Sequence, residues 1–269
     1  MKKMQIFFMV VFILLLLVAL TFAGCTNSKP PALNLEVNGE EVVEEVEGTE
    51  NVEKPELVPN TILYQGTASI RITTPEGKVI YIDPFDGGYG AKGYPIKGYD
   101  LPADLILVTH NHDDHNKTSV IKERNPNCKT IKWTEALVDG EYRIFDLGYV
   151  TVEAVEAYDG SNHNINHCVG YILTLSNGIS IYISGDTATT NQMATFAERN
   201  LDYAFFCIVE KITMSPEEAS ACAALVKAKH SLPYHTGWPE IFDRDIAEQF
   251  EAKGRIILEP GEELILDGK

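Results

Sequence analysis

The chain has few basic residues and a large excess of acidic ones. Its 269 residues include 22 lysines and arginines against 39 aspartates and glutamates, which gives a formal charge of −17. Setting aside the two lysines within residues 1–24 and the net −7 of residues 25–61 leaves residues 62–269 near −12. So acidic a surface repels phosphate backbones at long range. The composition therefore argues against DNA or RNA as a partner.

Cysteine is also scarce, with five in the chain. The four that follow Cys25 form no CxxC pair and have no regular spacing: Cys128, Cys168, Cys207 and Cys222. Cys207 lies in an apolar, strand-like run and Cys222 in an alanine-rich helix pattern, so both are predicted to be core thiols. An exported location would permit a disulfide, but the sequence singles none out.

A long apolar run is present at the N-terminus. Residues 4–23 are nearly all apolar, follow Lys2 and Lys3, and lead into Phe22, Ala23, Gly24 and Cys25. This layout is typical of an export signal, and it resembles a bacterial lipobox except that Phe22 stands where leucine is usual. We expect residues 1–24 to be a signal peptide and Cys25 to carry lipid that anchors the protein to the outer face of the cytoplasmic membrane. The alternative is an uncleaved membrane anchor, since about 20 apolar residues can span a bilayer.

Residues 25–61 contain nine glutamates, two lysines and no aromatic residue. Such a segment has little apolar surface to offset the entropy of ordering. We expect a disordered tether, kept extended by its like charges, that holds a domain away from the membrane. An acidic binding segment is the alternative.

Residues 62–269, about 208 residues, suit one domain. Apolar runs at 68–72 and 79–82 flank a Thr-Pro-Glu-Gly turn and predict a hairpin, and a glycine-rich loop is predicted at 87–98. Further strands are predicted at 105–108, 142–145, 150–155, 169–175, 179–183, 203–208, 231–234 and 256–258. Helices are predicted at 116–123, 192–199 and 241–252. Another is predicted from Pro216 to Lys229, because Ser215 and the residues after it have the pattern of a helix start. This order fits a two-sheet sandwich flanked by helices.

Three histidines and two aspartates follow the apolar run 105–108 within seven residues, as Thr-His-Asn-His-Asp-Asp-His at 109–115. Imidazole and carboxylate are the ligands that hold zinc, iron or manganese. At this spacing they cannot all face one ion from a regular helix or strand, but a loop can wrap them around one or two ions. The run therefore predicts a metal site at the end of a buried strand, with a polar turn as the alternative.

Later residues extend this motif. His163, the run Gly185-Asp186-Thr187 and His235 follow it in order, and the whole set resembles the metallo-β-lactamase superfamily. The HxHxDH signature of that superfamily is matched at every defined position. The spacing and the Pro233-Tyr234-His235 ending are most similar to the branch that contains L-ascorbate-6-phosphate lactonase. The resemblance covers residues 62–269, and it implies an α/β (α+β) fold, the αββα metallo-β-lactamase sandwich, with its site at one edge.

The resemblance also implies ligands for two divalent metal ions. His110, His112 and His163 would hold the first ion. Asp114, His115 and His235 would hold the second, Asp186 would bridge the two, and Asp114 would also be the catalytic carboxylate. The set contains no cysteine, which favours zinc, manganese or iron over a softer metal.

Several neighbouring residues compete for these roles. His167 is the alternative to His163, which is preferred because its six-residue lead to Val169 resembles the family pattern. His230 is the alternative to His235, and its own expected role is to interact with a helix end. Asp83 is expected either to orient a ligand histidine or to cap a turn. Asp113 is expected to be solvated.

The implied activity is hydrolysis of a small molecule. Two metal ions would lower the pKa of a bound water toward neutrality, and the resulting hydroxide would attack an ester or lactone, an amide or a phosphoester. The alternatives are a phospholipid or phosphodiester hydrolase at the membrane and a non-catalytic metal-binding surface lipoprotein. Relatives commonly have an Asp-Gly or Gly-Gly pair after the strand at 203–208, where this chain has Val209-Glu210-Lys211, so Glu210 and Lys211 face either the pocket or solvent. The candidates for the leaving-group acid are His167, His230 and Tyr234.

Overall fold

The computed structural model describes residues 59–87 and 98–267. The predicted signal peptide, the predicted tether up to residue 58 and residues 88–97 of the predicted glycine-rich loop lie outside the described residues. Within the described ranges, no helix combines the length and apolar character needed to cross a membrane.

The first sheet has six strands in the order β14-β1-β2-β3-β4-β5. They are β1 (Thr61–Gly66), β2 (Ser69–Thr73), β3 (Val79–Ile82), β4 (Ala103–Val108), β5 (Arg124–Lys132) and β14 (Glu263–Ile265). β2 pairs antiparallel with β3 and places Ile70 opposite Ile82, which confirms the predicted hairpin. β3, β4 and β5 run parallel, so their carboxyl ends meet at one edge of the sheet.

The second sheet also has six strands, in the order β13-β12-β11-β10-β9-β8. They are β8 (Ile144–Asp146), β9 (Val150–Glu156), β10 (Val169–Leu175), β11 (Ser180–Ile183), β12 (Tyr203–Cys207) and β13 (His230–Tyr234). β11, β12 and β13 are parallel, while β10 is antiparallel to both β9 and β11. A small separate hairpin joins β6 (Leu137–Val138) to β7 (Glu141–Tyr142).

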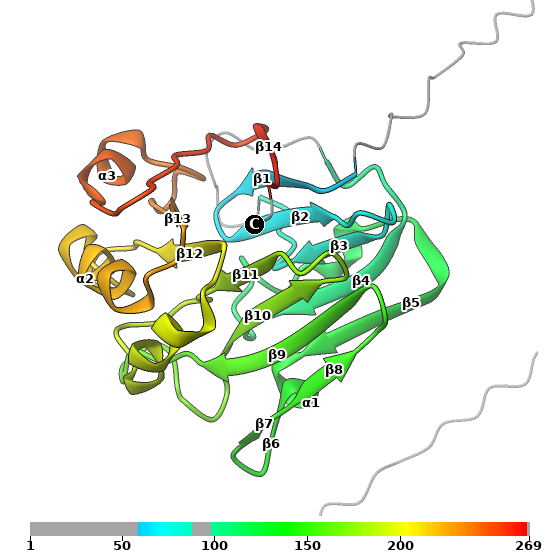
Figure 1. Ribbon diagram of the computed structural model, residues 1–269, viewed down its shortest axis with the longest axis horizontal. Helices are drawn as coiled ribbons and strands as arrows, with labels where there is room; N and C mark the ends of the chain where they lie inside the picture. The colour runs from blue at the N-terminus through cyan, green and yellow to red at the C-terminus, as the bar shows by residue number, and fades with distance from the viewer. Residues whose placement is uncertain (1–58, 88–97, 268–269) are drawn as a thin grey trace, which may run out of the picture. The chain divides into compact units, whose positions relative to one another are not determined.

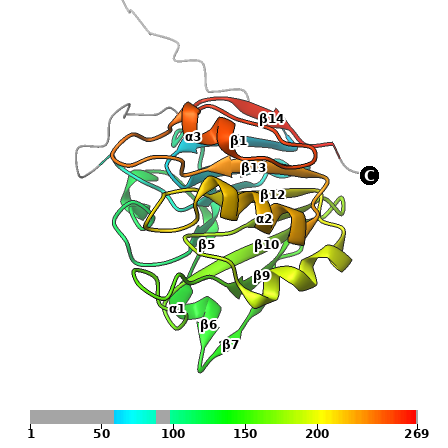
Figure 2. The same cartoon turned by 90° about the vertical axis from the view of Figure 1, so that its left-hand side faces the viewer.

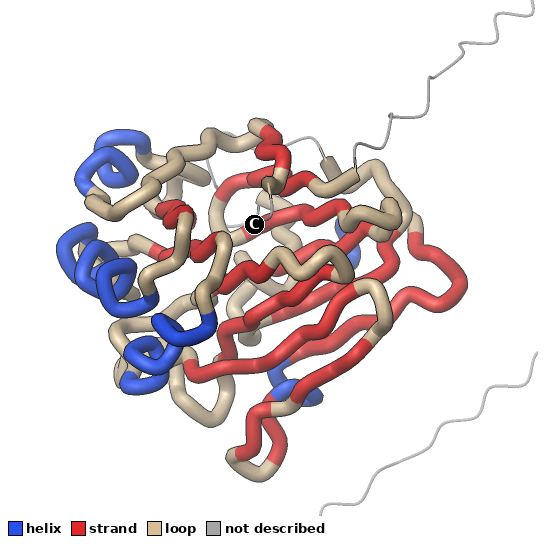
Figure 3. Tube along the Cα trace, viewed as in Figure 1, coloured by secondary structure: helices blue, strands red, loops and turns tan. Residues whose placement is uncertain are grey.

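Helices cover the second sheet more fully than the first. The α-helices are α1 (Trp133–Ala136), α2 (Pro216–Val226) and α3 (Arg244–Gln249), and the 3₁₀ helices are η1 (Thr118–Val120) and η2 (Asn191–Arg199). In Figures 1 and 3 most of the helical segments lie on one side of the strands, and Figure 2 shows α2 in front of the second sheet. The outer face of the first sheet instead packs against η1 and the segment near Leu101.

Alternating side chains explain these layers. In β4, Leu105 and Leu107 join the large core between the sheets, whereas Ile106 and Val108 join the smaller cluster on the outer face. Successive side chains of a strand point to opposite faces, so a strand that is apolar throughout has to be covered on both. All six residues of β4 are buried. The arrangement is the predicted metallo-β-lactamase sandwich of mixed α and β structure.

Three of the four predicted helices are shorter than expected, and the fourth has about the predicted length but is a 3₁₀ helix. Residues 116–123 contain only the three-residue η1, residues 192–199 fall in the 3₁₀ helix η2, and α3 covers only the middle of residues 241–252. α2 starts as predicted, with the Ser215 side chain accepting a hydrogen bond from the Glu218 N–H, but it ends at Val226 because Lys227 is left-handed at φ +56°. The start of α2 was predictable from the local sequence, whereas nothing in the sequence indicated that the helix ends before Lys227.

Strand predictions failed mainly at the sheet edges. The predicted strand 256–258 is wrong, and the C-terminal strand is β14, which pairs with β1. β5 was missed because its sequence is polar and contains a proline, and it is mostly exposed. The predicted strand 142–145 is divided between β7 and β8. Edge strands have one partner and little apolar patterning, so their existence depends on the neighbour that offers the pairing.

Candidate metal centre

Strand ends from both sheets meet at one edge of the sandwich. Asp83 directly follows β3, the 109–115 loop follows β4, Asp186 comes three residues after β11, and His235 directly follows β13. His163 lies in the loop between β9 and β10. Because β10 is antiparallel to β11, the start of β10 lies beside the end of β11, and the loop that carries His163 reaches the same edge.

Glycine allows the two sheets to approach each other here. Gly185 has φ +62°, and a Cβ atom on it would lie 2.8 Å from the Val169 carbonyl oxygen and 3.2 Å from Thr109. The Val169 N–H donates to the Thr109 carbonyl at 3.0 Å, so the loop of the first sheet is tied directly to β10 of the second. The turn that precedes Asp186 therefore requires glycine for both its conformation and its space.

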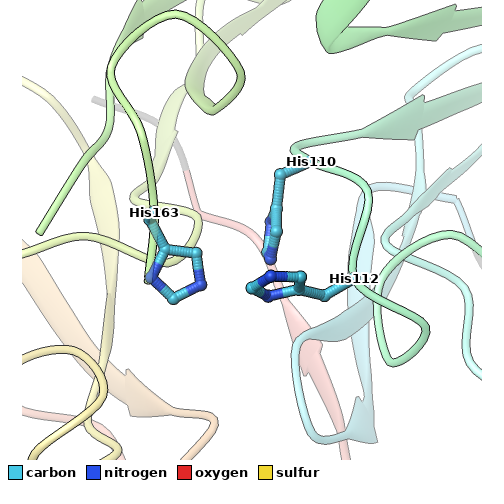
Figure 4. A group of neighbouring side chains, drawn as sticks. All are labelled: His110, His112 and His163. Atoms are coloured by element: carbon cyan, nitrogen blue, oxygen red, sulfur yellow. The ribbon is translucent and has the colours of Figure 1, made fainter. Parts of the chain in front are cut away.

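The first group of side chains is the one predicted for the first metal ion. His110, His112 and His163 each offer a ring nitrogen within 4.8 Å of the others. Figure 4 shows the three rings gathered from two separate loops. His110 and His163 are buried, whereas His112 is exposed. The pattern HxH places two rings on one loop, and the fold brings the third.

The second group is the one predicted for the second ion. Asp114, His115 and His235 lie within the same 4.8 Å limit. His235 Nε2 is 3.4 Å from Asp114 Oδ2, and His115 Nε2 is 3.7 Å from the same oxygen. The HxHxDH motif thus contributes His110 and His112 to the first group and Asp114 and His115 to the second, while His110 and His115 also form a third group with Asp186.

Asp186 lies between the two groups. Its Oδ1 is 3.5 Å from His115 Nε2, and its Oδ2 is 3.4 Å from His163 Nε2 and 3.7 Å from His235 Nε2. The side chain is nearly fully buried. All seven sequence-predicted site residues are therefore in one cluster, with Asp186 in the bridging position.

The donors in this cluster fit a metal centre. Four donor atoms of the cluster are buried and have no hydrogen-bond partner among the described residues: Nε2 of His110, His115 and His163, and Oδ1 of Asp186. A buried polar atom without a partner costs about 1–3 kcal/mol, so a group of them aimed at one place calls for a cation. Imidazole and carboxylate donors without thiolate suit zinc, manganese or iron.

Without a cation, the histidines and carboxylates of the cluster shift one another's pKa values. Burial alone would lower the pKa of His115, but the carboxylates of Asp186, Asp114 and Asp83 raise it well above its ordinary value. Burial and the neighbouring His115 hold the pKa of His110 well below the usual range. Burial would raise the pKa of Asp186, yet His115 and His235 hold it well below its ordinary value. Without a cation, the carboxylates around His115 therefore favour its protonated form.

Two carboxylates outside the cluster orient its histidines. Asp83 Oδ2 accepts from His115 Nδ1 at 2.9 Å and from the Thr109 hydroxyl at 2.7 Å, and Oδ1 accepts from the Thr109 N–H. The same hydroxyl lies 3.0 Å from His110 Nδ1, so it can accept that N–H. Asp83 therefore orients the candidate ligand His115 and also caps the loop, combining the two roles that the sequence left open. A partner on Nδ1 fixes the tautomer that leaves Nε2 free for a metal.

Asp159 plays the corresponding part for His163 and was not predicted. Its Oδ2 lies 2.8 Å from His163 Nδ1, and its Oδ1 accepts the backbone N–H groups of Ser161, Asn162 and His163. Burial opposes ionisation, but these hydrogen bonds lower the pKa of Asp159 to about 2. The position of an aspartate four residues before the histidine, ahead of Gly160 and Ser161, was the available signal.

Two of the residues at this edge have left-handed backbones. Asp83 has φ +47° and His235 has φ +50°. Such conformations cost of order 1 kcal/mol or more in non-glycine residues and persist where the surroundings hold them. The His235 N–H is held by the Thr67 carbonyl at 3.0 Å and by the Tyr64 hydroxyl at 3.2 Å, both from the first sheet. The position of His235 thus depends on contact between the sheets.

The competing histidines lie elsewhere. His167 is exposed and belongs to neither group. His230 is in β13, four residues before the end that carries His235, and its ring stacks on Tyr203 rather than lying at a helix end as expected. Tyr234 is fully buried, and burial raises its pKa well above the ordinary value. None of the three candidates for the leaving-group acid lines the cavity described next.

A cavity of about 320 Å³ opens over the cluster and is lined by His112, Asp114, Asp186 and His235. Asp113 is at its rim, partly exposed and paired with Lys117 at 3.0 Å. Glu210 and Lys211 are exposed and do not line it, whereas their neighbours Val209 and Ile212 do. The segment 209–212 therefore contributes to the cavity wall through Val209 and Ile212, and not through Glu210 and Lys211. The volume of the cavity suits a small molecule.

The four cysteines after Cys25 are free, and Cys207 and Cys222 are buried, as predicted for core thiols. The Thr187 N–H lies 3.4 Å from the Cys207 sulfur, directly after Asp186. The thiol is therefore a packing and hydrogen-bonding group beneath the loop that carries Asp186.

Comparisons with known proteins agree with this geometry. Residues 61–235 match the sequence profile of the β-lactamase superfamily domain. The chain is 31% identical over 227 residues to a UPF0173 metal-dependent hydrolase of Geobacillus sp. (strain WCH70), covering 75% of this chain and 97% of that protein. It is 33% identical over 213 residues to a UPF0173 metal-dependent hydrolase of Thermococcus kodakarensis, covering 70% and 92%.

Solved structures share the fold. One is Igni18, a metallo hydrolase from the archaeon Ignicoccus hospitalis, with a TM-score of 0.62 and 20% identity. The match covers 78% of this chain and 99% of that one. At this identity the similarity supports the fold alone.

Proposed function

The chain belongs to the metallo-β-lactamase superfamily and is a metal-dependent hydrolase, and from that premise we propose that it uses two divalent cations to hydrolyse a small molecule. The bond cleaved is an ester or lactone, an amide or a phosphoester. The motif likeness to L-ascorbate-6-phosphate lactonase supports a lactone among these. Zinc, manganese and iron all suit the donors.

The observation that carries the proposal is the convergence of buried donors that have no other partner. His110, His112 and His163 would hold the first cation, and Asp114, His115 and His235 the second. Asp186 has one oxygen toward His115 and the other toward His163, and it would bridge the two. Divalent cations held in this way act as Lewis acids and bring the pKa of water toward neutrality.

Asp114 is the catalytic carboxylate in this proposal. It is partly exposed and lines the cavity, in contrast to the buried Asp186. Its Oδ2 faces His235 Nε2 and His115 Nε2, which hold the carboxylate in place. From there it can accept a hydrogen bond from the attacking water and orient the water toward a substrate in the cavity.

Metal analysis tests the ligand set. The purified protein should contain close to two ions per chain, and Asp114→Ala combined with His235→Ala should lower this to about one, because both belong to one group. Asp113→Ala is the matched control: Asp113 adjoins Asp114 but pairs with Lys117 instead, so its metal content should not change. Full metal content in the double variant would refute the assignment.

A substrate panel tests the activity. Lactone, β-lactam, phosphodiester and acylated phospholipid substrates should include at least one that is turned over, with turnover lost in Asp114→Ala. Turnover of phospholipid would favour the alternative of a hydrolase working at the membrane. Failure of the fully metal-loaded protein to cleave any substrate would favour a non-catalytic metal-binding surface protein.

We also propose export and lipid anchoring at Cys25, with residues 25–61 as the tether and residues 62–269 as the catalytic domain. The support is the sequence of residues 1–25. Labelling with palmitate should be lost in Cys25→Ala. Persistence of the label would contradict lipid attachment at Cys25 and would favour the alternative of an uncleaved membrane anchor.

A further inference from the structure

The cavity above the candidate metal centre has an apolar wall made by Val209, Ile212 and Trp238. Val209 is buried, but Ile212 and Trp238 are each 38% exposed. The indole of Trp238 contacts the buried ring of Phe85, with centroids 6.4 Å apart. Two exposed large apolar side chains beside a candidate centre form a surface that a ligand can cover.

The turn that carries Ile212 is tied in place. The N–H groups of Ile212 and Thr213 donate to the Val209 carbonyl at 2.9 and 2.8 Å, and the Val209 N–H donates to the Thr213 hydroxyl at 2.9 Å. Ile212 is thus presented by a closed turn, and Trp238 is supported by another ring. The wall is preformed, so a ligand need not order it.

The polar part of the lining carries no positive side chain. Besides the candidate metal ligands it contains Asp113 and Asn162, and no lysine or arginine of the described ranges lines the cavity. The nearby Lys117 pairs with Asp113. Proteins bind phosphate and carboxylate groups of ligands with arginine and lysine. Apart from the proposed metal ions, the described lining therefore offers no lysine or arginine to pair with an anionic group.

We propose that the substrate is an uncharged small ester or lactone whose apolar side chain lies against Trp238 and Ile212, and that phosphorylated small molecules are poor substrates. This inference rests on the proposed function and narrows it. Water adds across the acyl C–O bond: its hydroxyl goes to the acyl carbon and its proton to the departing oxygen, giving an acid and an alcohol. The cavity of about 320 Å³ admits a short alkyl or aryl chain beside the ring.

Binding can be measured without turnover. The chain has two tryptophans, so Trp133→Phe leaves Trp238 as the single fluorescent reporter. Six-membered lactams with alkyl chains of increasing length serve as probes in the metal-loaded protein. The Kd should fall roughly three- to fivefold per added methylene until the cavity is full. The same lactam with a chain ending in sulfonate, a weak metal ligand, should bind roughly tenfold more weakly.

Variants locate the effect. In the same single-tryptophan protein, Ile212→Ala should weaken the longest-chain lactam roughly fivefold or more and leave the shortest unchanged. Ile212→Lys should reduce the difference in Kd between the alkyl and sulfonate probes, whereas Ile212→Met should leave that difference unchanged. Ile144→Ala is the matched control, because Ile144 is 65% exposed and lies on β8 rather than in the cavity. It should change no affinity.

The outcomes separate this inference from the proposed function. A Kd that does not depend on chain length, or tighter binding of the sulfonate probe, overturns the inference even if lactones or esters are hydrolysed. Chain-length dependence that is lost in Ile212→Ala supports it. If that dependence holds while no ester, lactone, amide or phosphoester is cleaved, the cavity has the proposed preference and the proposed hydrolysis is wrong.

Discussion

Replacing Asp83 by asparagine should weaken metal binding although residue 83 touches no candidate metal position. The change conserves size, and asparagine tolerates the left-handed backbone at φ +47°. The amide oxygen can still accept the Thr109 N–H, which places the NH₂ group toward Thr109 Oγ1 and His115 Nδ1. His115 Nδ1 would then have to accept a hydrogen bond, which moves its proton to Nε2, the atom that faces the other ligands.

The effect extends to His110 through the same hydroxyl. Thr109 Oγ1 now donates to Asp83 and can accept from His110 Nδ1 at 3.0 Å. With an NH₂ group at position 83, the hydroxyl must direct its proton elsewhere, and His110 Nδ1 is the nearby acceptor. Loss of such an orienting partner typically lowers metal affinity 10- to 100-fold, which is about 1.4–2.7 kcal/mol.

The assay is titration of metal against a competing chelator, with thermal unfolding of the metal-free protein measured in parallel. Asp104→Asn is the matched control, since Asp104 is also buried and accepts a backbone N–H, from Val79, but lies at the opposite end of β4. It should lower stability and leave metal affinity unchanged. An Asp83→Asn affinity within twofold of wild type, or an equal loss in Asp104→Asn, would refute the orienting role.

Three further predictions concern stability and protons. Tyr64→Phe removes the hydroxyl that donates to the Thr67 carbonyl and accepts the His235 N–H, so the free energy of unfolding should fall by about 1 kcal/mol and metal affinity should drop. Tyr182→Phe removes a buried hydroxyl that has no hydrogen-bond partner in the described part of the chain, so it should not lower the free energy of unfolding; equal losses in the two variants would contradict this. Gly170→Ala would place a Cβ 2.8 Å from the Ser184 carbonyl oxygen, so Tm should fall by several degrees, and an unchanged Tm would show that β10 can move away from the segment that follows β11. The pKa of His115 is raised well above 6.5 in the metal-free protein, so metal binding at pH 7 should release protons, and metal affinity should rise with pH until His115 is deprotonated. Calorimetry in buffers of different ionisation enthalpy would detect the released protons. Binding heats that do not depend on the buffer would contradict the prediction.

The central strands were predictable because both of their faces are buried. β4 is apolar except for Asp104 and β10 is nearly all apolar, and each was predicted within about two residues, although the equally buried β1 was not predicted. β5 was not predictable, because residues 124–132 are polar and their pairing is supplied by β4. β14 was missed for a similar reason, since its partner β1 lies about 200 residues earlier in the chain. A strand has an apolar pattern where it is buried, and edge strands are little buried, so they lack such a pattern.

The candidate site was also predictable only in part. The run at 109–115 places four of the seven predicted residues on one loop, and their order with His163, Asp186 and His235 was readable from the chain. The hydrogen bonds that orient them were not, because Asp83 precedes His115 by 32 residues and meets it only through the parallel pairing of β3 with β4. Trp238 and Ile212 likewise carry no motif, and only the fold makes them one wall.

The sequence by itself indicated a two-sheet sandwich and the chemistry of the candidate ligands, because burial and metal coordination each favour particular residue types. The resemblance of its motifs implied the type of sandwich. The tertiary structure alone decided which ring nitrogens are free, which carboxylates orient them and what surrounds the cavity. Those properties are contacts between residues far apart in the chain, and at this edge they exist because Gly185 lets the loop after β11 approach Thr109 of the first sheet closely.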